Sequence, residues 1–428
     1  MAVQQGYGKM AGTDALVFAY DTGDAVNSYK GKPATNHLKF INQQYTPVVE
    51  DYFRLSNGSH EVNVPTLGTR TVKYVDIWND YSNGSGRCCL SLFGFGTGIT
   101  SVSPNTTYMY QIVYKTDTGY SHPNYMYRYE YGASGYIKEG GLHSTGRRTP
   151  LGDGWYHAWG SFTTDVNTTY LNTYLFHYEY ATQNKVQVAQ VMLTEGSEVI
   201  PPRQFIDFEQ TRSATEGLLD LTGNSTVDLT NANYNSAAQI DLDGSNDSFE
   251  IGTHVANQGN VGSIEVVFKA DDSHRGAMVG WGDLGTSNWG TFEIGPSTGG
   301  YPDEYLSYVN VDSGGQNTSM MLRDSSGSSY KLSDNNYHHV IVVIDGVANS
   351  IYVDGEPQPV TFQVGSATDQ KFIRAANITN VRIGNSTYNG GHIPFDGQIP
   401  VVKFYNKGLT AAEVKSNFNN YKTRFNIA

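Results

Sequence analysis

Cysteine is almost absent from this chain of 428 residues. Its only two cysteines, Cys88 and Cys89, are adjacent. Neighbouring residues of a strand point to opposite faces, so a disulfide between them would be strained. We therefore expect two free thiols. The chain also has no cysteine spacing that would suit a metal.

Basic clusters and long apolar runs are absent too. The formal net charge is -13, and no cluster of Lys and Arg exceeds the pair in "GRR" (146–148). Nucleic-acid binding needs a basic surface, so no nucleic acid is expected as a partner. No apolar stretch approaches the ~20 residues of a membrane span, so no membrane partner is expected. Residues 1–15 contain no apolar signal core, and classical secretion is not expected.

Catalytic motifs are also missing. The sequence contains no nucleophile elbow, Walker loop, zinc-protease helix or Rossmann glycine pattern. Asp207 and Glu209 would share one strand face, but they lie in a linker segment. We expect a protein that is not an enzyme.

Glycine and tyrosine are abundant, with 47 and 31 residues. Five β-rich runs are bounded by turn residues, and these are 108–116, 185–193, 263–270, 338–345 and 349–355. Only 409–421 has a helical pattern, with Thr410 and Glu413 spaced as a capping box. These patterns predict an all-β protein with a short C-terminal helix. His338 and His339 begin one strand and are assigned structural roles.

Several blocks after residue 213 occur in a recognisable order, from "GLLDLTGNSTVDL" (217–229) to "FDGQIPVVKFYNKGLTAAEVKSNF" (395–418). Together they resemble the concanavalin A-like lectin/glucanase superfamily, in its laminin-G-like branch. The resemblance implies a jelly roll, a sandwich of two antiparallel sheets. Asp354-Gly355 and Asp396-Gly397 are expected to form tight hairpin turns.

The opening segment "LVFAYDTGDAVNSYKG" (16–31) matches text that normally precedes the block at 217 in that branch. We therefore predict a discontinuous domain made of 15–32 and 213–428. Residues 33–212 would form a second domain inserted into it, because loop tips tolerate insertions. Residues 1–14 would be a docking segment.

Segments 101–116, 153–164, 168–180 and 186–203 resemble carbohydrate-binding modules of the galactose-binding-like group, near families four and nine. The resemblance implies a second jelly roll. Two of its strands alternate aromatic residues with other residues, and aromatic rings stack on the apolar face of sugars. The candidate carbohydrate-binding residues are Tyr125, Tyr127, Tyr129, Tyr174, Tyr178 and Trp159. Packing in a core or an interface remains the alternative for each tyrosine.

Loop carboxylates often bind calcium in related jelly rolls. Asp241, Asp243 and Asp247 are the candidate ligands, although their spacing is not that of an EF-hand. A structural calcium ion is thus one expectation, and no other cofactor is expected.

Two nested sandwiches without a catalytic motif resemble virion structural proteins of tailed bacteriophages, especially of marine and cyanobacterial hosts. The resemblance implies a fibre, tail appendage or capsid decoration that displays a glycan-binding surface. Such a protein is made in the bacterial cytoplasm and released by lysis. Its partners would be other virion proteins and a host surface glycan. The protein would be an oligomer or part of a larger assembly. A purely architectural cement protein and a polysaccharide depolymerase are the alternatives.

Overall fold

The computed structural model divides the chain into two compact units. Unit 1 contains 1–32, 214–235 and 239–428, and unit 2 contains 33–213 with 236–238. The described residues are 15–38, 59–65, 67–73, 88–90, 100–116, 125–142, 147–177, 186–207, 209–257, 259–270, 275–282, 288–295, 305–312, 318–322, 332–373, 378, 380–388 and 391–428. All later structural statements concern these residues.

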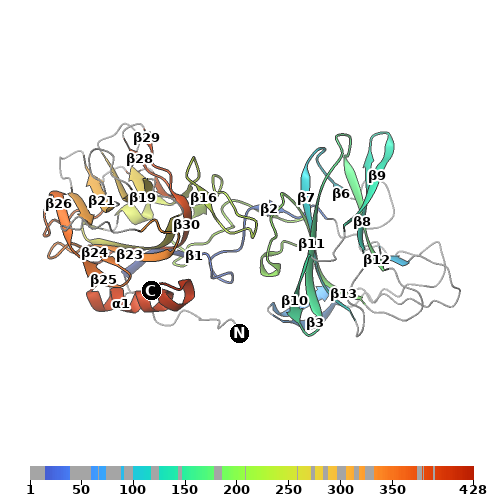
Figure 1. Cartoon of the computed structure of the whole chain (residues 1–428), viewed down its shortest axis with the longest axis horizontal. Helices are drawn as coiled ribbons and strands as arrows, with labels where there is room; N and C mark the ends of the chain where they lie inside the picture. Colours follow the sequence, from blue (N-terminus) through green and yellow to red (C-terminus); the bar gives the residue numbers. More distant parts are fainter. Residues whose placement is uncertain are drawn as a thin grey trace. The chain divides into compact units, whose positions relative to one another are not determined.

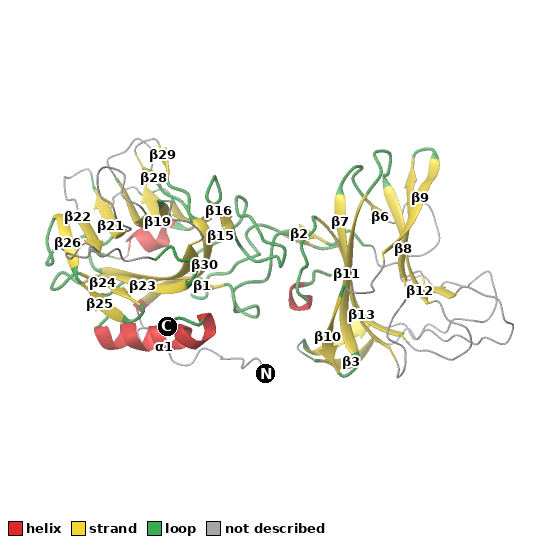
Figure 2. Ribbon diagram, in the orientation of Figure 1, coloured by secondary structure: helices red, strands yellow, loops and turns green. Residues whose placement is uncertain are grey.

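Unit 1 is built from two large antiparallel sheets (Figures 1 and 2). The seven-stranded sheet contains, in spatial order, β1 (Leu16–Asp21), β30 (Asp396–Tyr405), β18 (Gly262–Ala270), β23 (Tyr337–Ile344), β24 (Ser350–Val353) and β25 (Glu356–Gln358), with β16 (Leu242–Asp243) also paired to β30. The eight-stranded sheet contains β15 (Val227–Asp228), β17 (Phe249–Ile251), β27 (Val381–Ile383), β19 (Gly276–Gly282), β20 (Trp289–Gly295), β21 (Tyr305–Val311), β22 (Thr318–Leu322) and β26 (Val360–Val364). A short hairpin joins β28 (Thr387–Tyr388) to β29 (Gly391–His392), and η3 (Thr253–Asn257) is a 3₁₀ turn.

The core of unit 1 follows from strand alternation. In β18, Ile264, Val266 and Phe268 are fully buried in the main hydrophobic cluster, which also takes residues from the eight-stranded sheet. The intervening Val267 joins a second cluster with Tyr421 of the C-terminal helix. The seven-stranded sheet is therefore covered on both faces, by the other sheet and by the helix. Its central strands are continuous apolar runs for that reason.

The opening segment belongs to unit 1. Strand β1 pairs antiparallel with β30, and Phe18 and Tyr20 are fully buried. Further along, Tyr29 forms a bridge with Leu218. Asp220 secures this junction, because its Oδ1 accepts a 3.0 Å hydrogen bond from the amide of Ala19. This bond joins residues that are 201 positions apart in the sequence. The two segments thus form one continuous structure.

Helix α1 (Ala411–Phe425) has the capping box that its sequence predicts. The Thr410 side chain accepts a hydrogen bond from the amide of Glu413, whose carboxylate in turn accepts from the amide of Thr410. The helix ends at Asn426, which adopts the left-handed conformation. Figure 1 shows α1 lying along the seven-stranded sheet near β23 and β25.

Unit 2 also contains two larger antiparallel sheets. The four-stranded sheet has the order β10 (Arg148–Gly152), β11 (Trp155–Thr163), β7 (Thr107–Thr116), β13 (Val186–Glu195). The five-stranded sheet has the order β5 (Cys88–Leu90), β12 (Tyr170–His177), β8 (Tyr125–Gly132), β9 (Gly135–Leu142), with β6 (Thr100–Ser101) paired to β12. Smaller elements are the hairpin of β3 (Ser59–Val64) and β4 (Gly68–Lys73), the pair β2 (Ala34–Thr35) and β14 (Thr211–Arg212), and the 3₁₀ turn η2 (Pro202–Gln204).

The all-β fold with antiparallel sheets and a C-terminal helix is confirmed, but one turn prediction is wrong. Asp354 and Gly355 do join β24 to β25, with φ of 50° and 79°. Asp396 and Gly397 form no hairpin, because they are the first residues of β30. Gly397 is required there for another reason. A Cβ atom at this position would lie 2.1 Å from the carbonyl oxygen of Lys269 in the neighbouring strand.

Candidate functional site

Four tyrosines meet on the five-stranded sheet of unit 2. The rings of Tyr131 and Tyr170 stack with centroids 5.0 Å apart and planes at 2°. Tyr136 lies against Tyr131 at 6.0 Å and against Tyr129 at 6.2 Å. We call Tyr129, Tyr131, Tyr136 and Tyr170 the tyrosine platform.

The platform lies on the outer face of its sheet. Along β8, Arg128 and Glu130 alternate with the platform residues, and Glu130 is fully buried. The Arg128 guanidinium lies 4.3 Å from the ring centroid of Phe162, which is on the four-stranded sheet. Arg128 and Glu130 thus point into the sandwich, and Tyr129 and Tyr131 point away from it. Tyr136 is 55% exposed.

Buried polar contacts fix the strand beneath the platform. Glu130 accepts hydrogen bonds from Arg128 Nε at 3.0 Å, from the amide of Asp165 at 2.8 Å and from Thr168 Oγ1 at 2.7 Å. Lys138 Nζ approaches the same carboxylate at 3.6 Å. A buried carboxylate with this many partners holds its backbone rigidly, so the platform rings are attached to a fixed strand.

The predicted sugar-binding residues are only partly brought together. Tyr129 is in the platform, whereas Trp159 is on β11 of the other sheet, where its ring lies 5.0 Å from that of His157. For Tyr125, Tyr127 and Tyr174 the structure describes the backbone register, in which Tyr127 pairs with Tyr174. Tyr178 lies outside the described residues.

Tyr136 is absent from the predicted set, because its role depends on a hairpin. The turn between β8 and β9 contains Gly135 with a φ of 102°. This turn folds Tyr136 back beside Tyr131 in the register. The sequence "YGASGY" (131–136) contains two glycines, which are a hairpin turn signal. A hairpin at this place predicts that Tyr131 and Tyr136 lie side by side.

Unit 2 also buries aromatic side chains that no ligand can reach. Tyr108, Tyr110 and Tyr114 of β7 are at most 1% exposed. His157 is buried beside Phe205, with ring centroids 5.6 Å apart, and burial lowers its pKa to about 4. Core packing is therefore the role of these tyrosines, and the partly exposed platform differs from them.

The three candidate calcium ligands do not converge. Asp243 and Asp247 are close, because the amide of Asp243 donates to Asp247 Oδ2 at 2.9 Å. Burial and the neighbouring Asp243 carboxylate raise the pKa of Asp247. Asp241 instead accepts a 3.0 Å hydrogen bond from Gln398 Nε2. Within the described ranges, no three His, Cys, Asp or Glu side chains form a metal-binding group, and calcium stays a prediction.

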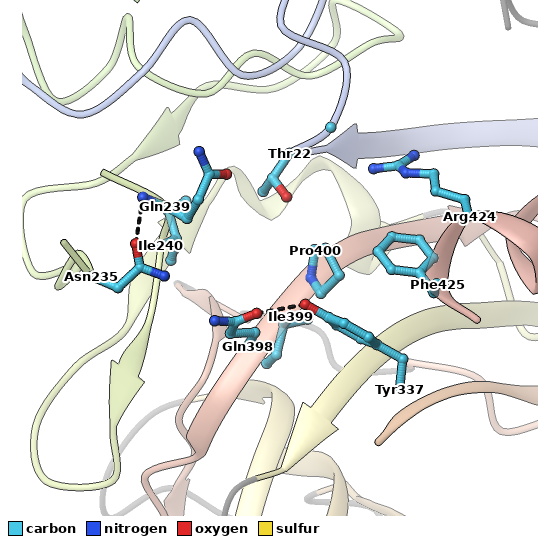
Figure 3. A pocket seen from close by; sticks show the side chains of 11 residues that line it. Thr22, Asn235, Gln239, Ile240, Tyr337, Gln398, Ile399, Pro400, Arg424 and Phe425 are labelled. Carbon is cyan, nitrogen blue, oxygen red and sulfur yellow. Dashed lines mark hydrogen bonds between the residues drawn. The ribbon is translucent and has the colours of Figure 1, made fainter. Parts of the chain in front are cut away.

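Unit 1 has a small pocket of about 210 Å³ (Figure 3). Five segments line it: the turn after β1, the loop at 235–240, the start of β23, the middle of β30 and the end of α1. Its apolar wall includes Ile399, Pro400 and Phe425, and its polar residues include Thr22 and Gln239. Figure 3 shows these side chains arranged around one opening.

A buried polar cluster lies between the seven-stranded sheet and α1. Glu265 Oε1 is 3.0 Å from His339 Nε2 and 3.3 Å from Lys403 Nζ. Its Oε2 accepts hydrogen bonds from Tyr405 at 2.6 Å and from Asn417 at 2.9 Å. Burial alone would raise the pKa of Glu265, but these partners hold it at about 2. The cluster is sealed by the helix and is structural.

The comparison with protein families concerns the larger part of unit 1. Residues 243–415 match the model of the concanavalin A-like lectin/glucanases superfamily. Over these residues, unit 1 is similar to that superfamily. The matched segment contains most of the polar cluster, and of the pocket it contains Tyr337, Gln398, Ile399 and Pro400. No curated protein sequence matches the chain significantly.

Solved structures give partial matches. A sialidase CBM40 from Ruminococcus gnavus is 14% identical, with 38% of this chain and 85% of that chain covered and a TM-score of 0.31. The NanB sialidase of Streptococcus pneumoniae (K499G mutant) is 18% identical, covering 41% and 26%, with a TM-score of 0.33. The receptor binding domain of botulinum neurotoxin D is 11% identical, covering 50% and 52%, with a TM-score of 0.34. This chain thus spans about a quarter of NanB and about half of the neurotoxin fragment.

No helix in the described part of the chain is long and apolar enough to cross a membrane.

Proposed function

We propose that the protein is a non-catalytic glycan-binding protein and that the tyrosine platform is its binding surface. The observation that carries this proposal is the 55% exposure of Tyr136 beside three further partly exposed tyrosines. Aromatic rings left at a surface expose apolar area that binding would bury.

The chemistry of the platform suits a sugar. A pyranose has an apolar face of C–H groups, which packs on a ring, and hydroxyls, which need partners. The exposed Tyr136 ring can supply the aromatic surface on which this C–H face packs. Its pKa is raised by local desolvation, Glu139 and Tyr131, so its O–H stays protonated and can donate a hydrogen bond at neutral pH. The stacked pair of Tyr131 and Tyr170 places two more phenols beside it.

In this proposal the protein is a structural component of a tailed bacteriophage particle: a fibre, tail appendage or capsid decoration. The support is the opening sequence "LVFAYDTGDAVNSYKGKPATN" (16–36) together with the nested sandwiches. The protein would be made in the bacterial cytoplasm and released by lysis. Its partners would be other virion proteins and a glycan of the host surface.

A glycan array and a host-envelope pull-down with the full chain test the binding role. The variant Tyr136→Ala should lose at least about tenfold in affinity, since an aromatic contact is removed from the centre of the surface. Tyr136→Phe keeps the ring and should retain most of the binding. Val166→Ala, at another exposed position of unit 2, is the matched surface control.

Three outcomes discriminate the alternatives. No binding to any glycan, with the platform covered by neighbours in the particle, would favour an architectural cement protein. Release of new reducing ends from host polysaccharide would show a depolymerase. Equal binding by the wild type and Tyr136→Ala would remove the platform from the proposal.

A further inference from the structure

The pocket of unit 1 has an apolar wall and a polar side. Ile399 and Pro400 of β30 are buried, and the ring of Phe425 packs on that of Tyr337 at 4.9 Å. Facing them are the side chains of Thr22, Asn235 and Gln239. A ligand that fits must therefore present one apolar face and several hydrogen-bonding groups.

One amide of the pocket is held in a fixed orientation. Gln398 donates from Nε2 to Asp241 Oδ1 at 3.0 Å and accepts at Oε1 from the Tyr337 hydroxyl at 2.5 Å. These two bonds determine which end of the amide is the donor. Asp241 thus orders the pocket wall.

The pocket has little net charge. Arg424 donates to both oxygens of Asp21 at 2.6 Å, so its guanidinium is matched by a carboxylate. The Gly23 backbone lies against the same guanidinium, since a Cβ atom there would be 1.9 Å from Arg424 Nη2. The arginine is held by its partners, and the pocket therefore favours a neutral ligand over an anion.

The volume sets the size of the ligand. The volume of about 210 Å³ is below the ~300–1,000 Å³ of typical sites for drug-sized ligands. That is room for one ring, and too little for an oligosaccharide or a drug-sized molecule.

We propose that this pocket binds one neutral sugar ring, such as the terminal hexose of a glycan. The ring's C–H face would pack on Pro400 and Phe425, and its hydroxyls would bond to the amides of Gln239 and Gln398. The choice of a sugar as ligand rests on the proposed glycan-binding function. The site itself is separate from the tyrosine platform and lies wholly in unit 1, so the protein has two different glycan sites.

Saturation-transfer NMR with the full chain and the methyl glycosides of glucose, galactose and mannose tests the pocket. Gln239→Trp should fill it and reduce affinity at least about tenfold. The fold should survive, because residue 239 is held through its main chain, which exchanges bonds with Asn235. Thr22→Val removes one hydroxyl at constant volume and should weaken binding severalfold.

Tyr136→Ala separates this site from the platform. It should leave the monosaccharide signal unchanged while lowering the affinity for longer glycans at least about tenfold. Loss of the monosaccharide signal in Tyr136→Ala, with no loss in Gln239→Trp, would overturn the pocket and keep the platform. No signal from any of the three glycosides, or a stronger signal from a glucuronide, would also overturn it. If Gln239→Trp does not fold, an unchanged affinity of Thr22→Val would contradict the proposal.

Discussion

At the scale of single residues, the buried charges of unit 1 determine how it responds to substitution. Glu265 is completely buried and has four polar partners, among them Lys403 and Asn417. Desolvation of both charges offsets much of their attraction, so such a pair adds little net stability. Breaking the pair is costly, because one buried charge then has no counterpart.

We expect Glu265→Gln to lower the free energy of unfolding by about 3 kcal/mol or more. The buried Lys403 ammonium, whose pKa burial already lowers, would lose its carboxylate. Adding Lys403→Met should restore part of the loss. Urea unfolding of the wild type, the single variant and the double variant measures this. A double variant less stable than Glu265→Gln would contradict the explanation.

His338 joins two loops through a charged contact. Its Nδ1 is 2.9 Å from Asp354 Oδ2, and its Nε2 is 3.3 Å from Asp334 Oδ1. A neutral imidazole can donate to only one of these carboxylates. Burial lowers the pKa of His338, but the two carboxylates outweigh burial and raise it above 6.5.

A raised folded-state pKa fixes the sign of the pH effect. The stabilisation is complete below the unfolded pKa of about 6.5 and is lost as the pH rises through the higher folded value. We expect the wild type to lose about 0.5–1 kcal/mol between about pH 6 and pH 8.5, since the contact is partly exposed. His338→Gln should lack this part of the loss. Urea unfolding at both pH values checks it, and an identical pH dependence in the variant would refute it.

At the scale of elements, the start of α1 is set by local sequence. Thr410→Ala removes the cap and should lower the free energy of unfolding by about 1 kcal/mol. Thr410→Ser keeps the capping oxygen and should retain the stability of the wild type, because serine caps helices at least as well as threonine. Thermal unfolding compares the two variants. A loss as large in Thr410→Ser would show that the methyl group, and not the cap, is what counts.

Strand β1 shows the opposite dependence. Its apolar sequence predicts a strand, but its partner β30 is far away in the sequence. The hydrogen bond from the Tyr20 hydroxyl to the carbonyl oxygen of Ile399, for example, joins residues 379 positions apart. No local pattern encodes such a pairing. The resemblance of 16–31 to a segment of the concanavalin A-like family indicated the domain to which β1 belongs, but not its pairing with β30.

At the scale of the whole molecule, the chain leaves unit 1 after Lys32 and returns at Ala214. The two connecting strands pair directly, with Ala34 opposite Arg212. The Cα atoms of this pair are therefore only about 5.5 Å apart or less, and the ends of the excursion lie close together. We expect that a chain with 33–213 replaced by a short Gly/Ser linker will fold.

The measurement is a cooperative thermal transition of the shortened chain, compared with residues 213–428 alone. The latter lacks Phe18 and Tyr20, which are fully buried in the core. Losing one such side chain costs about 3–5 kcal/mol, a large part of a typical domain stability. Equal stability of the two proteins would mean that β1 is dispensable.

The candidate sites were less predictable than the fold. Alternation along 125–131 placed Tyr129 correctly on an aromatic strand face, because side chains alternate along any strand. It could not predict that Tyr136 belongs to the platform, because Tyr136 reaches it only through a hairpin. It also could not show that Trp159 lies on a different sheet from Tyr129. The pocket was not predicted either, because its five segments are scattered from residue 22 to residue 425.

The sequence by itself determined the all-β class, the five strands predicted from their β-rich runs and the capped helix. These depend on the order of neighbouring residues and on composition, which are local or additive properties. The tertiary structure alone decided which tyrosines are buried and which form a surface, and which distant side chains surround a pocket. These depend on contacts between sheets, and a sheet joins strands regardless of their separation along the chain.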